Sequence, residues 1–408
     1  MSDFAISNAF SLDTANFPLE ARATLRLLER LNHGQLAVTF PDGQRAAFGW
    51  HDGSERADFQ LHNWNVVKAA LHNGDIGFAE SWIAGDWSTS DLPRLMTLLV
   101  RNRNSIDDAV YGSVSGRLLH RLRHWLNRNT RTQSKRNIHA HYDLGNEFYA
   151  VWLGDSMTYS SALFDSVARA PEDADLERGH AAKYTRVLEQ LQLKPGARLL
   201  EIGCGWGGFA VTAARAGHAV TGLTLSKRQL DHARQLLAGA GLPGDLRWQD
   251  YRDEYHQYDG IASIEMFEAV GEAYWPSYFA TLKRCLAPGG RACVQTITID
   301  DALFDRYRAG SDFIQQYIFP GGMLPSPSAF RMHAERAGLA IVDELRFGSD
   351  YAHTLRLWRQ RFLAQLPAVR ALGFDERFIR TWNFYLAYCE AAFVGGNTDV
   401  MHFTLVAR

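Results

Sequence analysis

A glycine-rich loop that follows a short apolar segment is the strongest chemical signal in this sequence of 408 residues. Residues 198–202 read as a buried strand, and the spacing E-x-G-x-G-x-G begins inside it at Glu201 and ends at Gly207. Glycines allow the backbone to turn tightly after a strand and to approach a ligand with no Cβ in the way. The loop therefore predicts a cofactor site, with a plain strand-to-helix turn as the alternative for a glycine loop taken by itself.

The strands after this loop indicate which cofactor it binds. Enzymes that bind nicotinamide dinucleotides carry a carboxylate at the end of the next strand, where it contacts the ribose. Here that strand ends at Thr224 without a carboxylate, so hydroxyl groups and the downstream Gln229 are expected to replace it. Asp250, after the third strand, is expected to meet the adenine. This pattern favours S-adenosylmethionine (SAM), whose sulfonium cation is attracted to aromatic faces and carboxylates. Candidates for that contact are Tyr159, Trp206, Glu265 and Glu268.

Strands and helices alternate from about residue 137 onward, and this alternation predicts the fold class α/β. We expect a Rossmann-like, doubly wound parallel sheet with helical insertions. The expected strands are residues 198–202, 218–224, 246–248, 258–264 and 291–297, and the expected helices are 176–192, 209–216, 226–238 and 274–286. A mostly helical insertion is expected over 300–337, with helices at 357–366 and 378–393 and a closing strand at 401–406, at the sheet edge.

The chain before this region predicts a small α+β domain over residues 1–110. An amphipathic helix is expected at 19–31, a hairpin at 34–40 and 45–48, a strand at 58–62, and helices at 66–71, 77–84 and 92–101. No phosphate loop or catalytic cluster stands out there. The predicted organisation is therefore a first domain over 1–110, a basic linker helix over 111–136 and a cofactor-binding domain over 137–408.

Composition limits the classes of function. The net charge of −2 gives no bulk electrostatic case for nucleic acid, so no nucleic-acid partner is expected. The four cysteines are scattered and form no CxxC pair, which argues against a disulfide framework and against a metal site. No signal peptide and no run of 18 apolar residues is apparent, so a soluble cytoplasmic protein is expected.

One local stretch is strongly basic. No acidic residue occurs between Asp108 and Asp143. The basic residues of this stretch are Arg117, Arg121, Arg123, Arg128, Arg131, Lys135 and Arg136. Leucines and a tryptophan lie among them at helical spacing, namely Leu118, Leu119, Leu122, Trp125 and Leu126. A basic helix with an apolar face can lie on an anionic membrane surface. The alternative is a solvated helix whose apolar face packs on the next domain.

With these features in place, the sequence resembles the cyclopropane-fatty-acyl-phospholipid synthases and the related mycolic acid methyltransferases. Four segments carry the likeness: 137–146 with 157–162, then 200–208, then 263–271, and finally 317–322 with 347–351. The segment 77–85 also resembles the small N-terminal domain of the bacterial synthases, which implies a lipid- or membrane-associated first domain. The cofactor contacts that the resemblance and the loop together imply are Tyr159, Ser160, Glu201, Gly203, Gly205, Gly207, Thr224, Leu225, Gln229, Asp250 and Tyr251.

The resemblance implies transfer of a methyl or methylene group from SAM to the double bond of an unsaturated phospholipid acyl chain, forming a cyclopropane ring. Such a transfer leaves a carbocation on the lipid, which requires a dry pocket lined by aromatic faces. Phe267, Tyr317, Phe319 and Tyr351 are expected to supply them. Two alternatives stay open: methylation of the alkene to a branched chain without ring closure, and a methyltransferase for a soluble nucleophile or one that has lost catalysis.

The resemblance also implies a bound bicarbonate that takes the proton lost from the new methyl group. Of the five positions that hold this ion, Glu268, the backbone of Ile297 and Tyr351 match. Ser161 stands where the family pattern has cysteine, and Gln295 stands where it has histidine. Both can still donate hydrogen bonds to an oxyanion, but Gln cannot carry a proton away as His can. Either the base is bound differently or the carbocation has another fate, and Glu268 then becomes the expected proton acceptor.

Further expectations concern a thiol, the oligomeric state, the location and the substrate. Cys389 aligns with a family cysteine sometimes treated as reactive, although its place among apolar residues in a helix favours a buried inert thiol. The resemblance, and nothing else, implies a homodimer. The expected location is cytoplasmic, peripheral to the inner face of the cell membrane, with unsaturated phospholipids as the substrate.

Overall fold

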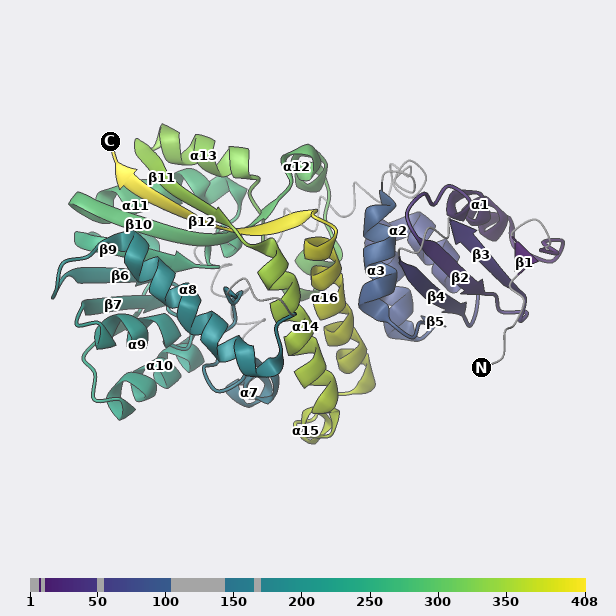
Figure 1. Ribbon diagram of the computed structural model, residues 1–408, viewed down its shortest axis with the longest axis horizontal. Helices are drawn as coiled ribbons and strands as arrows, with labels where there is room; N and C mark the ends of the chain where they lie inside the picture. The colour runs from purple at the N-terminus through teal and green to yellow at the C-terminus, as the bar shows by residue number, and fades with distance from the viewer. Residues whose placement is uncertain (1–6, 9–11, 50–54, 104–143, 165–169) are drawn as a thin grey trace.

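The computed structural model describes residues 7–8, 12–49, 55–103, 144–164 and 170–408, arranged as a small N-terminal unit beside a larger α/β unit (Figure 1). Each unit is built on its own sheet. The strand order is β1-β3-β2-β4-β5 in the small sheet and β11-β12-β10-β9-β6-β7-β8 in the large one. The predicted linker over 111–136, with all its basic residues, lies outside the described residues.

The N-terminal unit is a twisted sheet covered by three helices. Its strands are β1 (Ser7–Asn8), β2 (Gln35–Thr39), β3 (Arg45–Gly49), β4 (Arg56–Leu61) and β5 (Trp87–Ser88), and its helices are α1 (Leu19–Leu28), α2 (Asn65–Ala84) and α3 (Leu92–Arg101). The hairpin expected from the sequence is confirmed by antiparallel pairing of β2 with β3. The two helices expected at 66–71 and 77–84 form one helix, α2, which kinks where Gly74 takes a φ of 59°.

The large sheet is parallel at its centre. Its strands are β6 (Arg198–Ile202), β7 (Ala219–Thr224), β8 (Asp245–Trp248), β9 (Tyr258–Ile264), β10 (Leu286–Ile299), β11 (Leu339–Arg346) and β12 (Thr398–Ala407). Strands β10, β9, β6, β7 and β8 pair in parallel, as the alternation predicted. The prediction that the closing strand lies at the edge was wrong, because β11 pairs antiparallel with β12 and covers it.

Helices cover both faces of this sheet, which confirms the doubly wound arrangement. On one side α8 (Leu176–Leu191), α9 (Gly208–Arg215) and α10 (Lys227–Gly239) bury an aliphatic core. On the other side α11 (Trp275–Cys285) and α13 (Pro327–Arg336) bury an aromatic core. Short 3₁₀ turns η2 (Asp173–Asp175), η3 (Tyr251–Asp253), η4 (Phe267–Ala269) and η5 (Glu272–Tyr274) join these elements.

The remaining helical elements belong to the larger unit. They are α7 (Asn146–Leu153), α12 (Asp301–Ala309), a π-helical turn η6 (Ile314–Ile318), α14 (Gly348–Ala364), α15 (Leu366–Ala371) and α16 (Glu376–Val394). Helix α16 packs against α14 and also against α2 and α3 of the N-terminal unit (Figure 1). At this contact the Arg380 guanidinium lies 4.4 Å from the centre of the Trp82 ring, and its Nε donates to the Trp82 carbonyl oxygen over 2.7 Å. One apolar cluster therefore runs through both units.

Within the described residues, no helix is both long enough and apolar enough to cross a membrane.

Candidate active site

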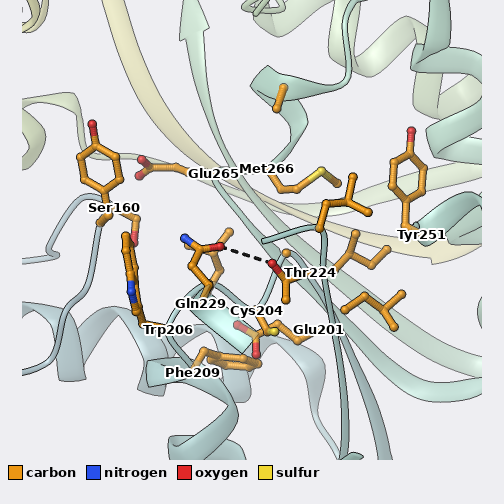
Figure 2. A pocket seen from close by; sticks show the side chains of 18 of the residues that line it. Ser160, Glu201, Cys204, Trp206, Phe209, Thr224, Gln229, Tyr251, Glu265 and Met266 are labelled. Carbon is orange, nitrogen blue, oxygen red and sulfur yellow. Dashed lines mark hydrogen bonds between the residues drawn. The ribbon is translucent and has the colours of Figure 1, made fainter. Parts of the chain in front are cut away.

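A pocket opens at the carboxyl ends of β6, β7 and β9, the edge at which ligands bind in doubly wound sheets (Figure 2). The expected cofactor residues that line it are Tyr159, Ser160, Glu201, Gly203, Gly205, Thr224, Leu225, Gln229, Asp250 and Tyr251. Trp206, Glu265 and Met266 line it as well. The structure therefore brings together segments that lie up to about a hundred positions apart in the chain.

The glycine loop forms the floor of the pocket. The backbone N–H groups of Gly203 and Cys204 both donate to the Leu223 carbonyl oxygen over 2.9 Å, which ties the loop to β7. Gly203 and Gly205 have φ values of 85° and 50°, in the left-handed region that glycine adopts without strain. A Cβ built on Gly205 meets no atom within 4 Å, so this position faces open space.

Gly207 has a different role from the one expected of it. It is not among the lining residues, and a Cβ built on it would lie 2.8 Å from the Cβ of Ala233. Its φ is 92°, and it precedes α9 directly. Gly207 therefore allows α9 and α10 to pack closely, which fixes the position of the loop.

The hydroxyl and amide that were expected in place of a ribose carboxylate lie next to each other. The Thr224 hydroxyl donates to the Gln229 side-chain oxygen over 3.3 Å (Figure 2). Ser226 caps α10 by accepting from the Gln229 N–H over 3.3 Å, so the start of this helix sets the Gln229 position. The Asp250 carboxylate pairs with Arg252 at 2.6 Å, which holds it at the pocket wall.

A buried carboxylate tests whether these residues fit SAM. Glu201 is 3% exposed and lines the pocket, and its Oε2 has no hydrogen-bond partner within the described residues. Burial raises the pKa of Glu201 to about 8, while the charge of Lys183 opposes the rise. A buried carboxyl oxygen without a partner requires a hydrogen-bonding group on the ligand. The hydroxyl groups of SAM can donate and accept, so the residues present fit this group in either protonation state of Glu201.

Two carboxylates at the end of β9 form the chemical centre of the site. Glu265 accepts three hydrogen bonds: from the Ser161 N–H at 2.8 Å, the Gln295 amide at 2.7 Å and the Tyr351 hydroxyl at 2.6 Å. Glu268 Oε1 accepts from the Ile297 N–H at 2.5 Å. All the residues implied for the bicarbonate site therefore meet here.

Glu268 is held away from the pocket lining. Its Oε1 also accepts from the Thr296 hydroxyl at 3.0 Å, whereas its Oε2 has no partner in the described part of the chain. Burial, followed by the charge of Glu265, raises the pKa of Glu268 to about 8. Near neutral pH this carboxyl is therefore mostly protonated, which makes it a poor acceptor for a proton.

The side chains around Glu265 are themselves oriented. The Gln295 amide oxygen is 2.8 Å from His402 Nε2. Burial lowers the pKa of His402 to about 3, so the ring is neutral and its Nε2 carries the hydrogen that Gln295 accepts. This contact turns the Gln295 NH₂ toward Glu265. The Ser161 hydroxyl donates instead to the Ala162 carbonyl at 2.8 Å, so Ser161 serves the site through its backbone.

An aromatic cluster, formed by Tyr159, Phe319, Tyr351, Trp358 and Tyr385, adjoins the pocket. The Tyr159 ring, which lines the pocket, stacks on Phe319 at 6.4 Å between centroids and lies 5.5 Å from Trp358. The hydroxyl groups of Tyr159 and Tyr385 are 2.8 Å apart. Two expected aromatic contributors, Phe319 and Tyr351, therefore belong to this cluster.

Three other expected site residues lie elsewhere. Phe267 is fully buried in the core between α11 and α13, where it contacts Trp275 and Phe330. Tyr317 is 40% exposed and donates its hydroxyl to Glu80 of the N-terminal unit over 2.5 Å. Cys389 does not line the pocket, and burial raises its pKa, so the thiol stays protonated. Spacing alone did not separate these positions from the pocket wall.

Sequence reasoning named Glu265 only as a sulfonium contact and missed its central position. The available signal was a pair of carboxylates three positions apart directly after a buried strand. What the sequence did not reveal is that Ser161, Gln295 and Tyr351 all converge on the first of them.

Comparison with known proteins places these features in context. A family model described as "Mycolic acid cyclopropane synthetase" matches residues 129–403. The chain is 39% identical over 399 residues to the Mycobacterium tuberculosis protein "Tuberculostearic acid methyltransferase UfaA1", covering 93% of this chain and 90% of that one. It is 35% identical to the "Cyclopropane-fatty-acyl-phospholipid synthase" of Escherichia coli, covering 84% and 86%.

Among solved structures, the mycolic acid cyclopropane synthase CmaA1 in complex with SAH and CTAB superposes with a TM-score of 0.61. It is 31% identical in sequence and covers 66% of this chain and 97% of its own. The large α/β unit thus has the fold of a class I SAM-dependent methyltransferase.

Proposed function

Because the chain belongs to the mycolic acid cyclopropane synthetase family, we propose that this SAM-dependent enzyme alkylates the double bond of an unsaturated phospholipid acyl chain. SAM-dependent modification of a lipid alkene is supported by two relatives that are named cyclopropane synthases, one of fatty-acyl phospholipid and one of mycolic acid. The proposal further specifies that the alkene belongs to a phospholipid. It is supported by the name of the Escherichia coli relative.

The observation that carries this proposal is the junction of the cofactor pocket with the aromatic cluster. Tyr159 belongs to both, and Glu265 lines the same pocket. An alkene is a weak nucleophile and its alkylation leaves a carbocation, so the reaction needs aromatic faces to stabilise the cation. A methyltransferase for an amine or hydroxyl needs no such surface.

Each part of the site has a task in this reaction. When bound, SAM supplies an electrophilic methyl group. Gly205 in the loop and Glu201 in β6 would bind and orient it, so that its methyl carbon lies in line with the alkene. The aromatic cluster faces the developing cation and displaces water that would otherwise trap it as an alcohol.

Ring closure to a cyclopropane is the first candidate for the outcome. A methyl-branched chain without ring closure is the second, and one observation favours it. Gln295 stands where the family pattern implies a proton-carrying histidine, and its amide donates to the Glu265 carboxylate. The relative with 39% identity is likewise named a methyltransferase, not a cyclopropane synthase. Both outcomes begin with the same methyl transfer.

The proposed organisation has three parts: a lipid-associated domain over 1–110, a basic linker over 111–136 and the catalytic domain over 137–408. We place the enzyme in the cytoplasm, attached to the anionic inner face of the cell membrane through the linker. The seven basic residues in a stretch without acidic ones support this placement. The homodimer remains a prediction from the resemblance.

The test uses the purified chain, SAM and vesicles of monounsaturated phosphatidylglycerol. We expect mass spectrometry of the acyl chains to show the gain of one CH₂ unit in the ring product, or in a branched product that keeps one double bond. Proton NMR then separates them, because only a ring gives upfield methylene signals. Vesicles of the saturated lipid are the matched control. Binding of S-adenosylhomocysteine without any gain in lipid mass contradicts the proposal.

A further inference from the structure

We propose that Glu265 is the proton acceptor of the reaction, so that a carboxylate of the chain itself takes the part of an external anion. This inference rests on the proposed function and identifies the base that the function requires. It differs from both earlier expectations, which assigned the proton to a bound bicarbonate or to Glu268. Four observations on the described residues support it.

The first observation is the convergence of donors. Tyr351, Gln295 and Ser161 donate to the two oxygens of Glu265 over 2.6, 2.7 and 2.8 Å. These donors come from α14, β10 and the segment before α8, which are far apart in the chain. An oxyanion site is a set of donors that converge on one point. Here the side chain of Glu265 already occupies that point.

The second observation is that each donor group of the set already has an acceptor among the described residues. The Ile297 N–H donates to Glu268, and the Ser161 hydroxyl donates to the Ala162 carbonyl. The Gln295 amide is fixed from behind by His402. A bicarbonate ion would have to displace the Glu265 carboxylate to gain the hydrogen bonds that the Tyr351 hydroxyl, the Gln295 amide and the Ser161 N–H make to it.

The third observation is the backbone at Glu265. Its φ is 48°, which a residue with a Cβ adopts only at a cost. The position is held by the Glu265 N–H, which donates to the Gln295 carbonyl over 2.8 Å. Strained conformations of this kind persist where the surroundings over-determine them, and they cluster at active sites. Figure 2 shows that the conformation directs the carboxylate across the pocket toward the segment that carries Ser160.

The fourth observation is the division of charge between the two carboxylates. Burial raises the pKa of Glu265, but the charge of the fully buried Lys183 and the three donors oppose that rise. The neighbouring Glu268 receives no such cation, and the charge of Glu265 favours its protonated form. The pair therefore carries its negative charge on Glu265, the member that lines the pocket.

The chemistry balances with Glu265 as the acceptor. The π electrons of the alkene form a bond to the methyl carbon while the carbon–sulfur bond breaks, which leaves a carbocation on the acyl chain. A Glu265 oxygen takes a proton from the transferred methyl group. The electron pair of that C–H bond closes the ring or, after a hydride shift, forms a methylene branch. The same base serves both outcomes, and its proton then passes to water when the product leaves.

The experiment compares four forms of the full chain in the vesicle assay, in buffer purged of carbon dioxide and in buffer with added bicarbonate. We expect the unaltered enzyme to turn over equally in both. Glu265→Gln should lower turnover on the order of 10²–10⁴-fold, the usual contribution of a general base, and should bind S-adenosylhomocysteine normally by calorimetry. Glu265→Gly relieves the positive φ and empties the anion position, so added bicarbonate or formate should restore part of its activity.

The matched control is Glu272→Gln, which removes a carboxylate that pairs with Arg308 outside the pocket and should turn over normally. Two results overturn the inference but not the proposed function. One is a requirement of the unaltered enzyme for bicarbonate, and the other is normal turnover by Glu265→Gln. Absence of any lipid product from the unaltered enzyme in both buffers overturns the proposed function. Binding of bicarbonate can also be measured directly, by titration of ¹³C-bicarbonate followed by NMR. We expect it to bind Glu265→Gly, and binding to the pocket of the unaltered chain contradicts the inference.

Discussion

Replacement of Glu268 by glutamine should make the stability of the protein less dependent on pH. The folded state raises the pKa of this carboxyl from 4.5 to about 8, because it buries the group beside Glu265. The unfolded chain ionises above pH 4.5 while the folded chain resists ionisation. The group therefore costs no stability below pH 4.5, costs progressively more as the pH rises toward 8, and costs a constant amount above that.

The size of the effect follows from this shift. One pKa unit corresponds to about 1.4 kcal/mol. Between pH 5 and pH 7 the Glu268 carboxyl is ionised in the unfolded chain and mostly protonated in the folded chain, which corresponds to a shift of nearly two pKa units over this range. The unaltered protein should therefore lose about 2.5 kcal/mol of unfolding free energy relative to Glu268→Gln over that range. Glutamine retains the acceptor for the Ile297 N–H, so the fold is preserved.

The assay is urea unfolding of both proteins at pH 5 and at pH 7, followed by tryptophan fluorescence. The quantity that matters is the change in the stability difference between the two proteins, because titrating groups that do not interact with Glu268 cancel in it. Glu272→Gln, which removes a partly exposed carboxylate that pairs with Arg308, is the control for the substitution itself. If Glu268→Gln shows the same difference from the unaltered protein at both pH values, the carboxyl of Glu268 ionises normally and our division of charge between the two carboxylates is refuted.

Two further predictions address the loop and the linker. Gly205→Val should weaken binding of S-adenosylhomocysteine by about tenfold or more in calorimetry, because the side chain fills open space in the pocket. Gly196→Val is its control, since Gly196 also has a positive φ and open surroundings but lies outside the pocket, and equal affinities of the two variants would contradict a cradle at Gly205. Reversal of charge at Arg121 and Arg123 should weaken sedimentation with anionic vesicles and leave neutral vesicles unaffected. Unchanged sedimentation would favour a linker that packs on a domain.

Local sequence patterns were sufficient to predict most of the fold. The limits of β6 and β9 agree with the residues predicted, because each is a short apolar run closed by a glycine or a polar residue. Helix α3 also agrees, since Asp91 caps its N-terminus and Pro93 stands in its first turn. The glycine loop followed from spacing alone, because its function depends on consecutive residues.

Elements that depend on distant partners were not predicted. Strand β11 is mostly partly exposed or exposed along its length, so its sequence carries no strand pattern strong enough to recognise. It exists as a strand because β12 offers an edge to pair with. Because β11 pairs with β12, β12 lies inside the sheet and not at the expected edge.

The sequence by itself determined the cofactor, the family and the carboxylates available for chemistry, since each depends on residue types at fixed local spacing. Only the tertiary structure decided which carboxylate lines the pocket and which is protonated away from it. Glu265 and Glu268 are nearly equivalent in the sequence, but Ser161, Gln295 and Tyr351 converge on the first, while the second is held away from the pocket. Hydrogen bonds and burial between distant segments set protonation, and no local pattern records them.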